Sequence, residues 1–183
     1  MHIDLLEAAI RKRRSLRCRT NALRLVNGLG DGLKGLILEQ YARHFVVQIF
    51  DKRWLKEKEA LAGFVRVRCS GRYLIMKDRT LSSSSRPDAF TADVWIEDDS
   101  SQTVVQENGL KFGVDLNDTL NSGLFLDMRH NRQVVAGLAK GRKVLNCFAY
   151  TCSFGVYCRA AGALSVVNVD VSRKSLSRGR RNY

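Results

Sequence analysis

The chain has 183 residues, 45% of them hydrophobic, and carries 31 Lys and Arg against 18 Asp and Glu, a formal net charge of +13. This length and composition indicate a globular protein of one ordinary or two small domains and exclude a disordered polymer. No apolar run approaches the roughly 20 residues of a membrane-spanning helix. The first charged cluster follows the apolar residues instead of preceding them, unlike a secretory signal. We therefore expect a cytoplasmic protein.

Positive charge is concentrated at the two ends of the chain. Residues 1–20 hold six Arg or Lys against two acids, and residues 171–183 hold five against none. Such an excess favours a polyanionic partner, most often nucleic acid, although solvated helix faces are also often basic. We predict that RNA is the partner and that its contacts include Arg11, Lys12, Arg13, Arg14 and Arg17.

The first half of the chain predicts a mainly antiparallel α+β region. A helix is expected within residues 4–16, β-like runs interrupted by four glycines within 23–41, a strand at 44–50, a helix at 55–64 and a strand at 72–78. Residues 81–87, ending at the single proline, read as a loop. A hairpin is expected at 103–115, because Asn108-Gly109 supplies both left-handed residues of a type I′ turn.

The second half predicts the beginning of a parallel α/β sheet. A loop leads into a helix that ends at Gly141, and residues 143–170 then read as strand, tight turn, helix and strand. A further helix begins near residue 172. The predicted fold class is therefore α/β, with an α+β domain at 1–118 and a partial Rossmann-like domain at 119–183.

The tight turn predicts a nucleotide-type site at the carboxyl end of the first parallel strand, where open α/β sheets bind ligands. Asp170 ends the second strand, where a carboxylate can accept hydrogen bonds from both ribose hydroxyls. This turn carries neither of the phosphate-binding patterns GxGxxG and GxxxxGK[ST], which argues against NAD and ATP. Adenosine without phosphate fits better, as in S-adenosylmethionine (SAM). A β-α-β unit without any ligand is the alternative.

The five cysteines are interpreted as reduced thiols. They are odd in number, form no CxxC pair and lack histidines at metal-ligand spacing. We expect no metal site.

Four ordered blocks carry a resemblance to a known family. These are "RLVNGLGDGLKGLILEQYARHFVVQ", "ENGLKFGVDL", "NSGLFLDMRHNR" and "KVLNCFAYTCSFGVYCRAAGALSVVNVD". Together they resemble class I SAM-dependent ribosomal RNA methyltransferases of the large-subunit cytosine-5 type, over roughly residues 10 to 183. The resemblance implies a central α+β domain followed by a catalytic Rossmann-like domain.

The resemblance also implies a set of cofactor-binding residues. Leu124, Phe125, Asp127 and Arg129 match the family's "FLDQR" stretch, with Met128 in place of Gln. Asp127 and Arg129 would hold the charged ends of the methionine moiety, although a helix-start acid and a solvated arginine explain them equally well. The implied cofactor-binding residues are Phe125, Asp127, Arg129, Asn146, Phe148, Tyr150, Thr151, Ser153, Phe154 and Asp170.

Three features depart from the family pattern. Asn146 replaces an acid, which removes a charge near the cofactor. Cys152-Ser153 replaces Gly-Gly, and if both positions need positive φ, the combined losses would weaken binding roughly a hundredfold. The family's Asp-Pro-Pro loop and catalytic cysteine have no counterpart here, so we assign no catalytic residue. The chain thus reads as truncated after the second Rossmann strand.

The leading hypothesis is an RNA methyltransferase, acting on cytosine C5 of ribosomal RNA, whose activity in this short chain is doubtful. The alternative is a non-catalytic RNA-binding module derived from such an enzyme. The incomplete sheet leaves an exposed edge through which we expect a homodimer to form.

Overall fold

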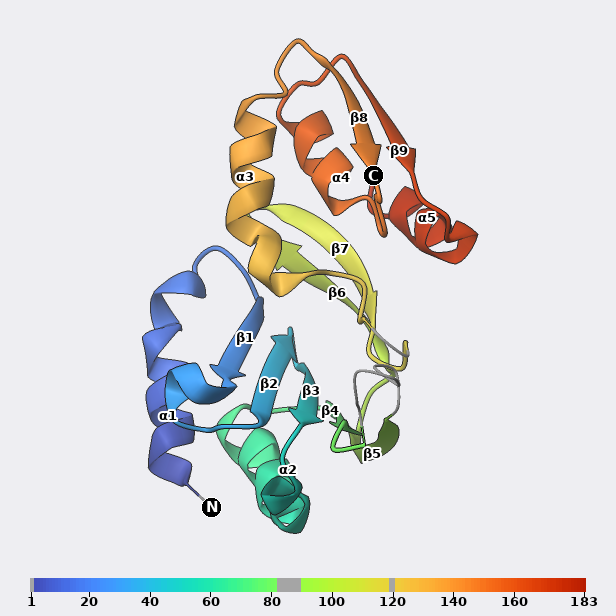
Figure 1. The fold of residues 1–183 in the computed structure, drawn as a ribbon. Helices are drawn as coiled ribbons and strands as arrows, with labels where there is room; N and C mark the ends of the chain where they lie inside the picture. Colours follow the sequence, from blue (N-terminus) through green and yellow to red (C-terminus); the bar gives the residue numbers. More distant parts are fainter. Residues whose placement is uncertain (1, 82–89, 119–120) are drawn as a thin grey trace.

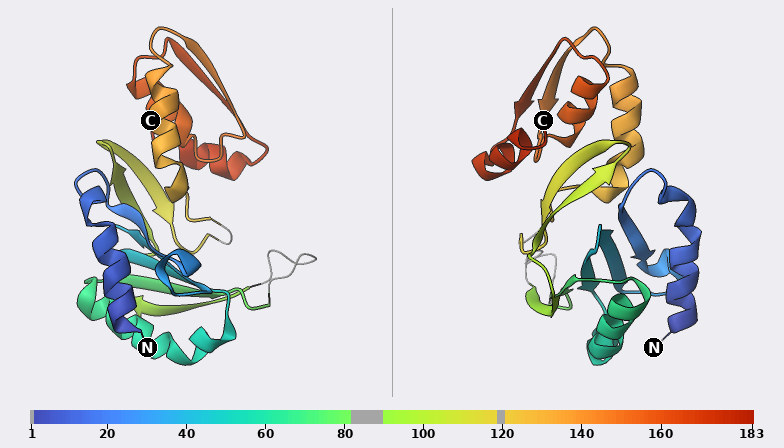
Figure 2. Two further views of the ribbon diagram at one scale, coloured as in Figure 1. Left: turned by 60° about the vertical axis from the view of Figure 1, so that its left-hand side comes forward. Right: turned by 180° about the vertical axis from the view of Figure 1, so that it is seen from behind.

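The computed structural model describes residues 2–81, 90–118 and 121–183. In these residues the strands form a five-stranded sheet, a two-stranded hairpin and a two-stranded parallel sheet. Figures 1 and 2 show the five-stranded sheet with its helices at one end of the molecule, the parallel pair with its helices at the other, and the hairpin between them. No helix of the described residues is long and apolar enough to cross a membrane.

The five-stranded sheet has the strand order β1-β2-β3-β4-β5. Its strands are β1 (Ala22–Asn27), β2 (Leu36–Tyr41), β3 (His44–Ile49), β4 (Tyr73–Asp78) and β5 (Thr91–Glu97). Only β3 and β4 run parallel, because helix α2 (Lys58–Arg68) crosses between them. Helix α1 (Ile3–Lys12) precedes the sheet, and short 3₁₀ helices occur at Arg14–Leu16, Gly28–Asp31 and Lys52–Glu57.

The expected strands and helices of this region are confirmed, but β5 was not predicted. Its first four residues, Thr91 to Val94, are exposed, so the segment lacks the apolar alternation by which a half-buried strand is recognised. The loop expected at residues 81–87 lies, apart from Leu81, outside the described residues.

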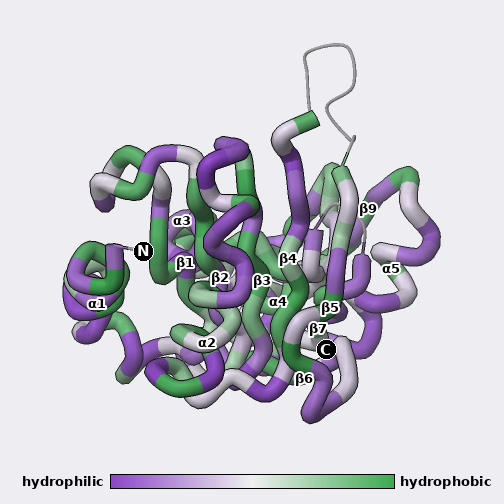
Figure 3. Tube along the Cα trace, turned by 90° about the horizontal axis from the view of Figure 1, so that it is seen from below, coloured by the Kyte–Doolittle hydropathy of each residue, from purple (hydrophilic) through white to green (hydrophobic). Residues whose placement is uncertain are grey.

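Alternate residues of β1 to β4 face opposite sides of the sheet. Leu23, Phe45 and Leu74 belong to a core that includes Leu6 and Ala9 of α1 and Phe64 of α2. The residues next to them in sequence, such as Val46 and Tyr73, belong to a second core shared with the hairpin. Seen from below, hydrophobic residues are concentrated along these strands (Figure 3).

The hairpin forms as the sequence predicts. Strands β6 (Gln102–Glu107) and β7 (Leu110–Asp115) pair antiparallel around Asn108 and Gly109, whose φ angles are 50° and 84°. Both are left-handed, as a type I′ turn requires. The hairpin packs its Val105 and Phe112 into the second core together with Tyr157 from the second half, so it joins the two halves.

The second half forms a parallel β-α-β unit. Its elements are a 3₁₀ helix (Leu126–Met128), α3 (Arg129–Gly137), β8 (Lys143–Cys147), α4 (Ser153–Ala160), β9 (Ser165–Val169) and α5 (Arg173–Arg180). α3 ends before the expected Gly141. β8 and β9 pair in parallel, and one face of the pair leaves Leu145, Val167 and Val169 at least half exposed. The homodimer expected through this incomplete sheet stays a prediction.

Candidate cofactor-binding site

The turn between β8 and α4 has an unusual backbone. Phe148, Tyr150 and Cys152 have φ angles of 56°, 47° and 60°. A non-glycine residue in this region costs on the order of 1–3 kcal/mol and persists only where its surroundings hold it. Three such residues within five positions make this turn the prime candidate for a functional backbone conformation.

Asp170 holds this turn from the end of β9. Its Oδ2 accepts a hydrogen bond from the Tyr150 amide at 2.8 Å, and its Oδ1 accepts one from the Ser172 amide at 2.8 Å. The Ser172 amide and then the Tyr150 amide lower the pKa of Asp170, so the side chain is an anion at neutral pH. The carboxylate and the turn therefore face each other across the ends of the two parallel strands.

Two other segments fasten the turn. The Tyr150 hydroxyl donates to the Asn121 carbonyl at 3.0 Å, and the Thr151 hydroxyl donates to the Gly123 carbonyl at 2.6 Å. From beyond α5, the Asn182 amide group donates to the Thr151 carbonyl at 2.9 Å. The strained conformation is thus held by contacts from three different parts of the chain.

The strain expected at Cys152-Ser153 is found at only one of the two residues. Cys152 is left-handed and precedes α4, whereas Ser153 is the first helical residue. The expectation was wrong for Ser153, because this residue already has the helical backbone of α4. The Cys152 side chain is buried against Gly179 of α5, and burial followed by the Asp170 charge raises its thiol pKa.

The structure places one predicted cofactor residue from outside the turn, Phe125, against it. The rings of Phe125 and Tyr150 lie 5.2 Å apart, which places Phe125 beside the turn. Asp127 is exposed and lines a cavity over the five-stranded sheet, and Arg129 is the first residue of α3. The Asn146 amide group donates to Asn168 on the neighbouring strand at 2.8 Å.

The remaining predicted cofactor residues lie in or beside the turn. Phe148 is 92% exposed, and Ser153 is buried at the start of α4. Phe154 lies with its ring centre 6.0 Å from the guanidinium of Arg132. Phe148 therefore offers an aromatic surface, whereas Ser153 and Phe154 face the protein.

Two of the predicted basic residues contact Asp31: Arg13 at 2.8 Å, and the exposed Lys12 more weakly at 3.4 Å. Arg13 makes two hydrogen bonds of 2.8 Å to Asp31, whose side chain is buried. Arg11, Lys12, Arg14 and Arg17 are exposed. The structure thus gives Arg13 a role in fixing α1 to the first glycine-rich turn, and RNA contact by the exposed residues stays a prediction.

A buried ion pair that contacts the segment at Phe125 was not predicted from the sequence. Arg132 of α3 and Glu107 of β6 are both fully buried and are joined by two hydrogen bonds of 2.9 and 3.0 Å. Arg132 also donates to the Phe125 carbonyl at 3.0 Å, and the Tyr157 hydroxyl donates to Glu107 at 2.9 Å. Arg132 is the last residue of the block "FLDMRHNR", and this block was the only feature of the sequence that pointed to it. The block does not indicate that Arg132 pairs with Glu107, which lies 25 residues away.

The same fold is found in solved methyltransferase structures. A protein of Streptococcus mutans assigned as a SAM-dependent methyltransferase superposes with a TM-score of 0.84 and 27% identity, over 98% of this chain and 47% of that one. A methyltransferase structure in complex with S-adenosylhomocysteine (SAH) gives the same TM-score and identity over 98% and 46%. The mixed α/β fold is therefore one that methyltransferases use.

The family itself follows from the sequence comparison. The S-adenosylmethionine-dependent methyltransferase family matches residues 19–183, so the chain belongs to this family. The ribosomal RNA large subunit methyltransferase I of Aeromonas salmonicida is 34% identical over 87% of this chain and 40% of its own length. A ribosomal RNA large subunit methyltransferase of Deinococcus radiodurans is 28% identical over 90% and 41%. The chain thus spans about 40% of the length of these relatives, and the prediction of SAM as the family's cofactor is confirmed.

Proposed function

We propose that this chain binds SAM at the turn 148–152 and Asp170 and serves the methylation of ribosomal RNA, with cytosine C5 as the acceptor atom. The observation that carries the proposal is the pairing of the Tyr150 amide with Asp170 at 2.8 Å. It supports a site in which one ionised carboxylate lies directly beside a backbone turn. The division into domains at 1–118 and 119–183 is part of the same proposal.

The residues present fit an adenosine ligand. Asp170 is only half-buried, and its two backbone bonds use about half of the four lone-pair positions of a carboxylate. The remaining positions suit the two ribose hydroxyls, and the exposed ring of Phe148 suits contact with a flat base. When bound, SAM would supply an electrophilic methyl group, and this chain's residues would orient the nucleoside that carries it.

The RNA substrate is proposed from the relatives and from the charge of the chain. The relatives described above are named as methyltransferases of large-subunit ribosomal RNA. The net charge of +13 and the exposed Arg11, Lys12, Arg14 and Arg17 favour a polyanion. Methyl transfer to cytosine C5 requires a cysteine thiolate that first adds to ring C6 and so makes C5 nucleophilic. The raised thiol pKa of buried Cys152 and Cys158 argues against either residue in that role.

Calorimetric titration with SAH tests the cofactor site. We expect saturable binding by the wild-type chain and a loss of about 10- to 100-fold in affinity for Asp170→Ala, because hydrogen bonds to a charged group are worth roughly 1.5–3 kcal/mol. Asp93→Ala is the matched control, since Asp93 is an exposed acid paired with Lys58. No heat from the wild-type chain at millimolar SAH would reject the proposed site. RNA binding that persisted in that case would favour the non-catalytic module.

A further inference from the structure

A cavity of about 470 Å³ lies over one end of the five-stranded sheet, under the segment that leads to α3. It forms because the second face of the sheet is apolar at one end of the strands and polar at the other. The residues at one end, including Tyr73 and Ile75, belong to the second core, which they share with the hairpin. At the other end the same face presents polar and charged side chains, and the hairpin does not cover them. These are Arg24, Glu39, Gln48 and Lys77.

Three cationic side chains, Arg24, Lys77 and Arg79, line this cavity together with the two acids Glu39 and Asp127. Arg24 bonds Glu39 at 2.7 Å, so the one buried acid is already neutralised. Lys77 is only 2% exposed and donates to the carbonyl oxygen of Asp118 at 2.8 Å. Burial, with the neighbouring Arg79 charge, lowers the pKa of Lys77 to about 8. A buried ammonium beside a second cation is stabilised when an anion enters the cavity.

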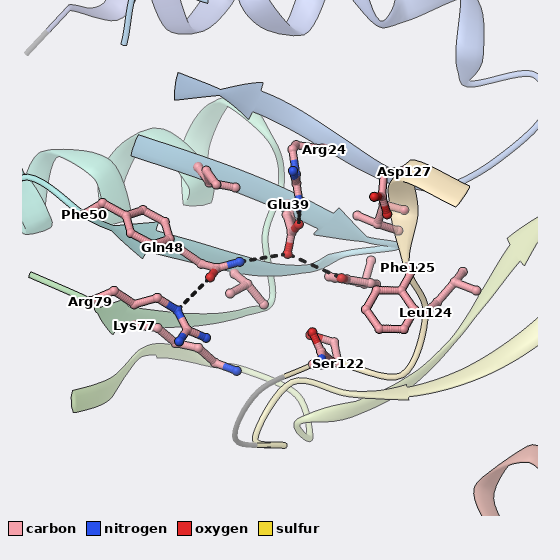
Figure 4. Close-up of a pocket in the computed structure, with 15 residues that line it drawn as sticks. Arg24, Glu39, Gln48, Phe50, Lys77, Arg79, Ser122, Leu124, Phe125 and Asp127 are labelled. Carbon is pink, nitrogen blue, oxygen red and sulfur yellow. Dashed lines mark hydrogen bonds and ion pairs between the residues drawn. The ribbon is translucent and has the colours of Figure 1, made fainter. Parts of the chain in front are cut away.

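An aromatic ring faces these cations. Figure 4 shows Lys77 and Arg79 on one side of the cavity and Phe125 on the opposite side. Phe125 is 42% exposed. It also contacts Tyr150, whose hydroxyl bonds the carbonyl of Asn121 in the cavity wall. The cavity and the proposed cofactor turn therefore share a wall.

We propose that this cavity binds one unstacked nucleotide of a single-stranded RNA, with its phosphate on Lys77 and Arg79 and its base against Phe125. The inference rests on the proposed function and deepens it by placing the acceptor strand beside the methyl donor. The volume lies within the range of small-ligand sites. Single-stranded RNA is recognised by this combination of cationic groups for the backbone and an aromatic face for the base.

Cytidine 5′-monophosphate, cytidine and inorganic phosphate are the probes for this site. Binding is followed by amide chemical shifts on the full chain. We expect the monophosphate to shift the amides of Lys77 and Phe125 and to bind at least tenfold more tightly than either other probe. Lys77→Met should lower its affinity about tenfold or more, to the level of cytidine, while leaving SAH binding unchanged. Lys140→Met is the matched control, since Lys140 is exposed beyond α3.

The outcomes separate this inference from the proposed function. Asp170→Ala should retain monophosphate binding, so a failure of the SAH titration leaves the nucleotide result intact. Equal affinity for phosphate and for the monophosphate would overturn the base contact. Unchanged affinity in Lys77→Met, or shifts confined to residues outside the cavity, would overturn the site. Phe125→Leu is a second test variant, and we expect it to lower the affinity for both the monophosphate and cytidine about tenfold.

Discussion

Replacing Arg132 with Met removes one partner of a fully buried ion pair. The change leaves the Glu107 carboxylate, also fully buried, with the Tyr157 hydroxyl at 2.9 Å as a neutral partner. Breaking a buried pair from one side costs about 3–5 kcal/mol, because the remaining charge is uncompensated. The Phe125 carbonyl loses a donor as well. We therefore expect Arg132→Met to lower the free energy of unfolding by about 3–5 kcal/mol.

Urea unfolding followed by circular dichroism measures this loss. The double variant Glu107→Met with Arg132→Met should recover most of it, since a buried pair replaced by apolar side chains of similar volume is often neutral or stabilising. Arg66→Met is the matched control, because Arg66 pairs with Asp98 on the surface at 2.9 Å and should cost less than about 1 kcal/mol. A loss in Arg132→Met no larger than in this control would show that the buried pair is not worth more than a surface pair. So would a double variant as unstable as the sum of its single changes.

Two further predictions concern Lys77 and Gly179. Lys77 is protonated in both the folded and the unfolded chain below its folded pKa of about 8, and its burial cost is then fully present. Between pH 8 and about 10.5 only the unfolded chain keeps the proton on Lys77. The free energy of unfolding should therefore rise with pH by up to about 3 kcal/mol relative to Lys77→Met. If urea unfolding gives the same pH dependence for the wild-type chain and for Lys77→Met, the lowered pKa of Lys77 is contradicted. Gly179→Ala would bring a methyl group against Cys152 and the backbone of the turn, so we expect a loss of about 1–3 kcal/mol in stability and weaker SAH binding. Gly137→Ala, where the added methyl group meets nothing within 4 Å, should be neutral or stabilising, and equal melting temperatures for the two variants would count against the close contact.

The elements that the sequence predicted best are those with a local signal. Asn108-Gly109 determines its hairpin because both residues accept a left-handed backbone. The run from Val144 to Asp170 shows strand, turn and helix in order. Strand β5 was not predicted because most of its residues are exposed and show no alternation of apolar and polar residues.

Only those parts of the candidate site that follow directly from neighbouring residues in the sequence were predicted. Asp170 and the turn could be placed because each follows a strand that the sequence reveals. Phe148 and Tyr150 were named as candidates, but their left-handed backbone was not predicted, since neither residue type favours that conformation. The cavity around Lys77 was also missed, because it depends on strand register and on a segment about 45 residues away. Contacts between segments so far apart in the chain leave no local pattern in the sequence.

In the proposed function, Asp170 and the turn at Tyr150 form one SAM site. It is tested most directly by amide chemical shifts of the full chain during titration with SAH. The amides of Tyr150 and Ser172 both bond the Asp170 carboxylate, so ribose hydroxyls that engage this carboxylate should shift both signals along a common saturation curve. Saturable binding that leaves these two amides unmoved would place the ligand elsewhere and contradict the account.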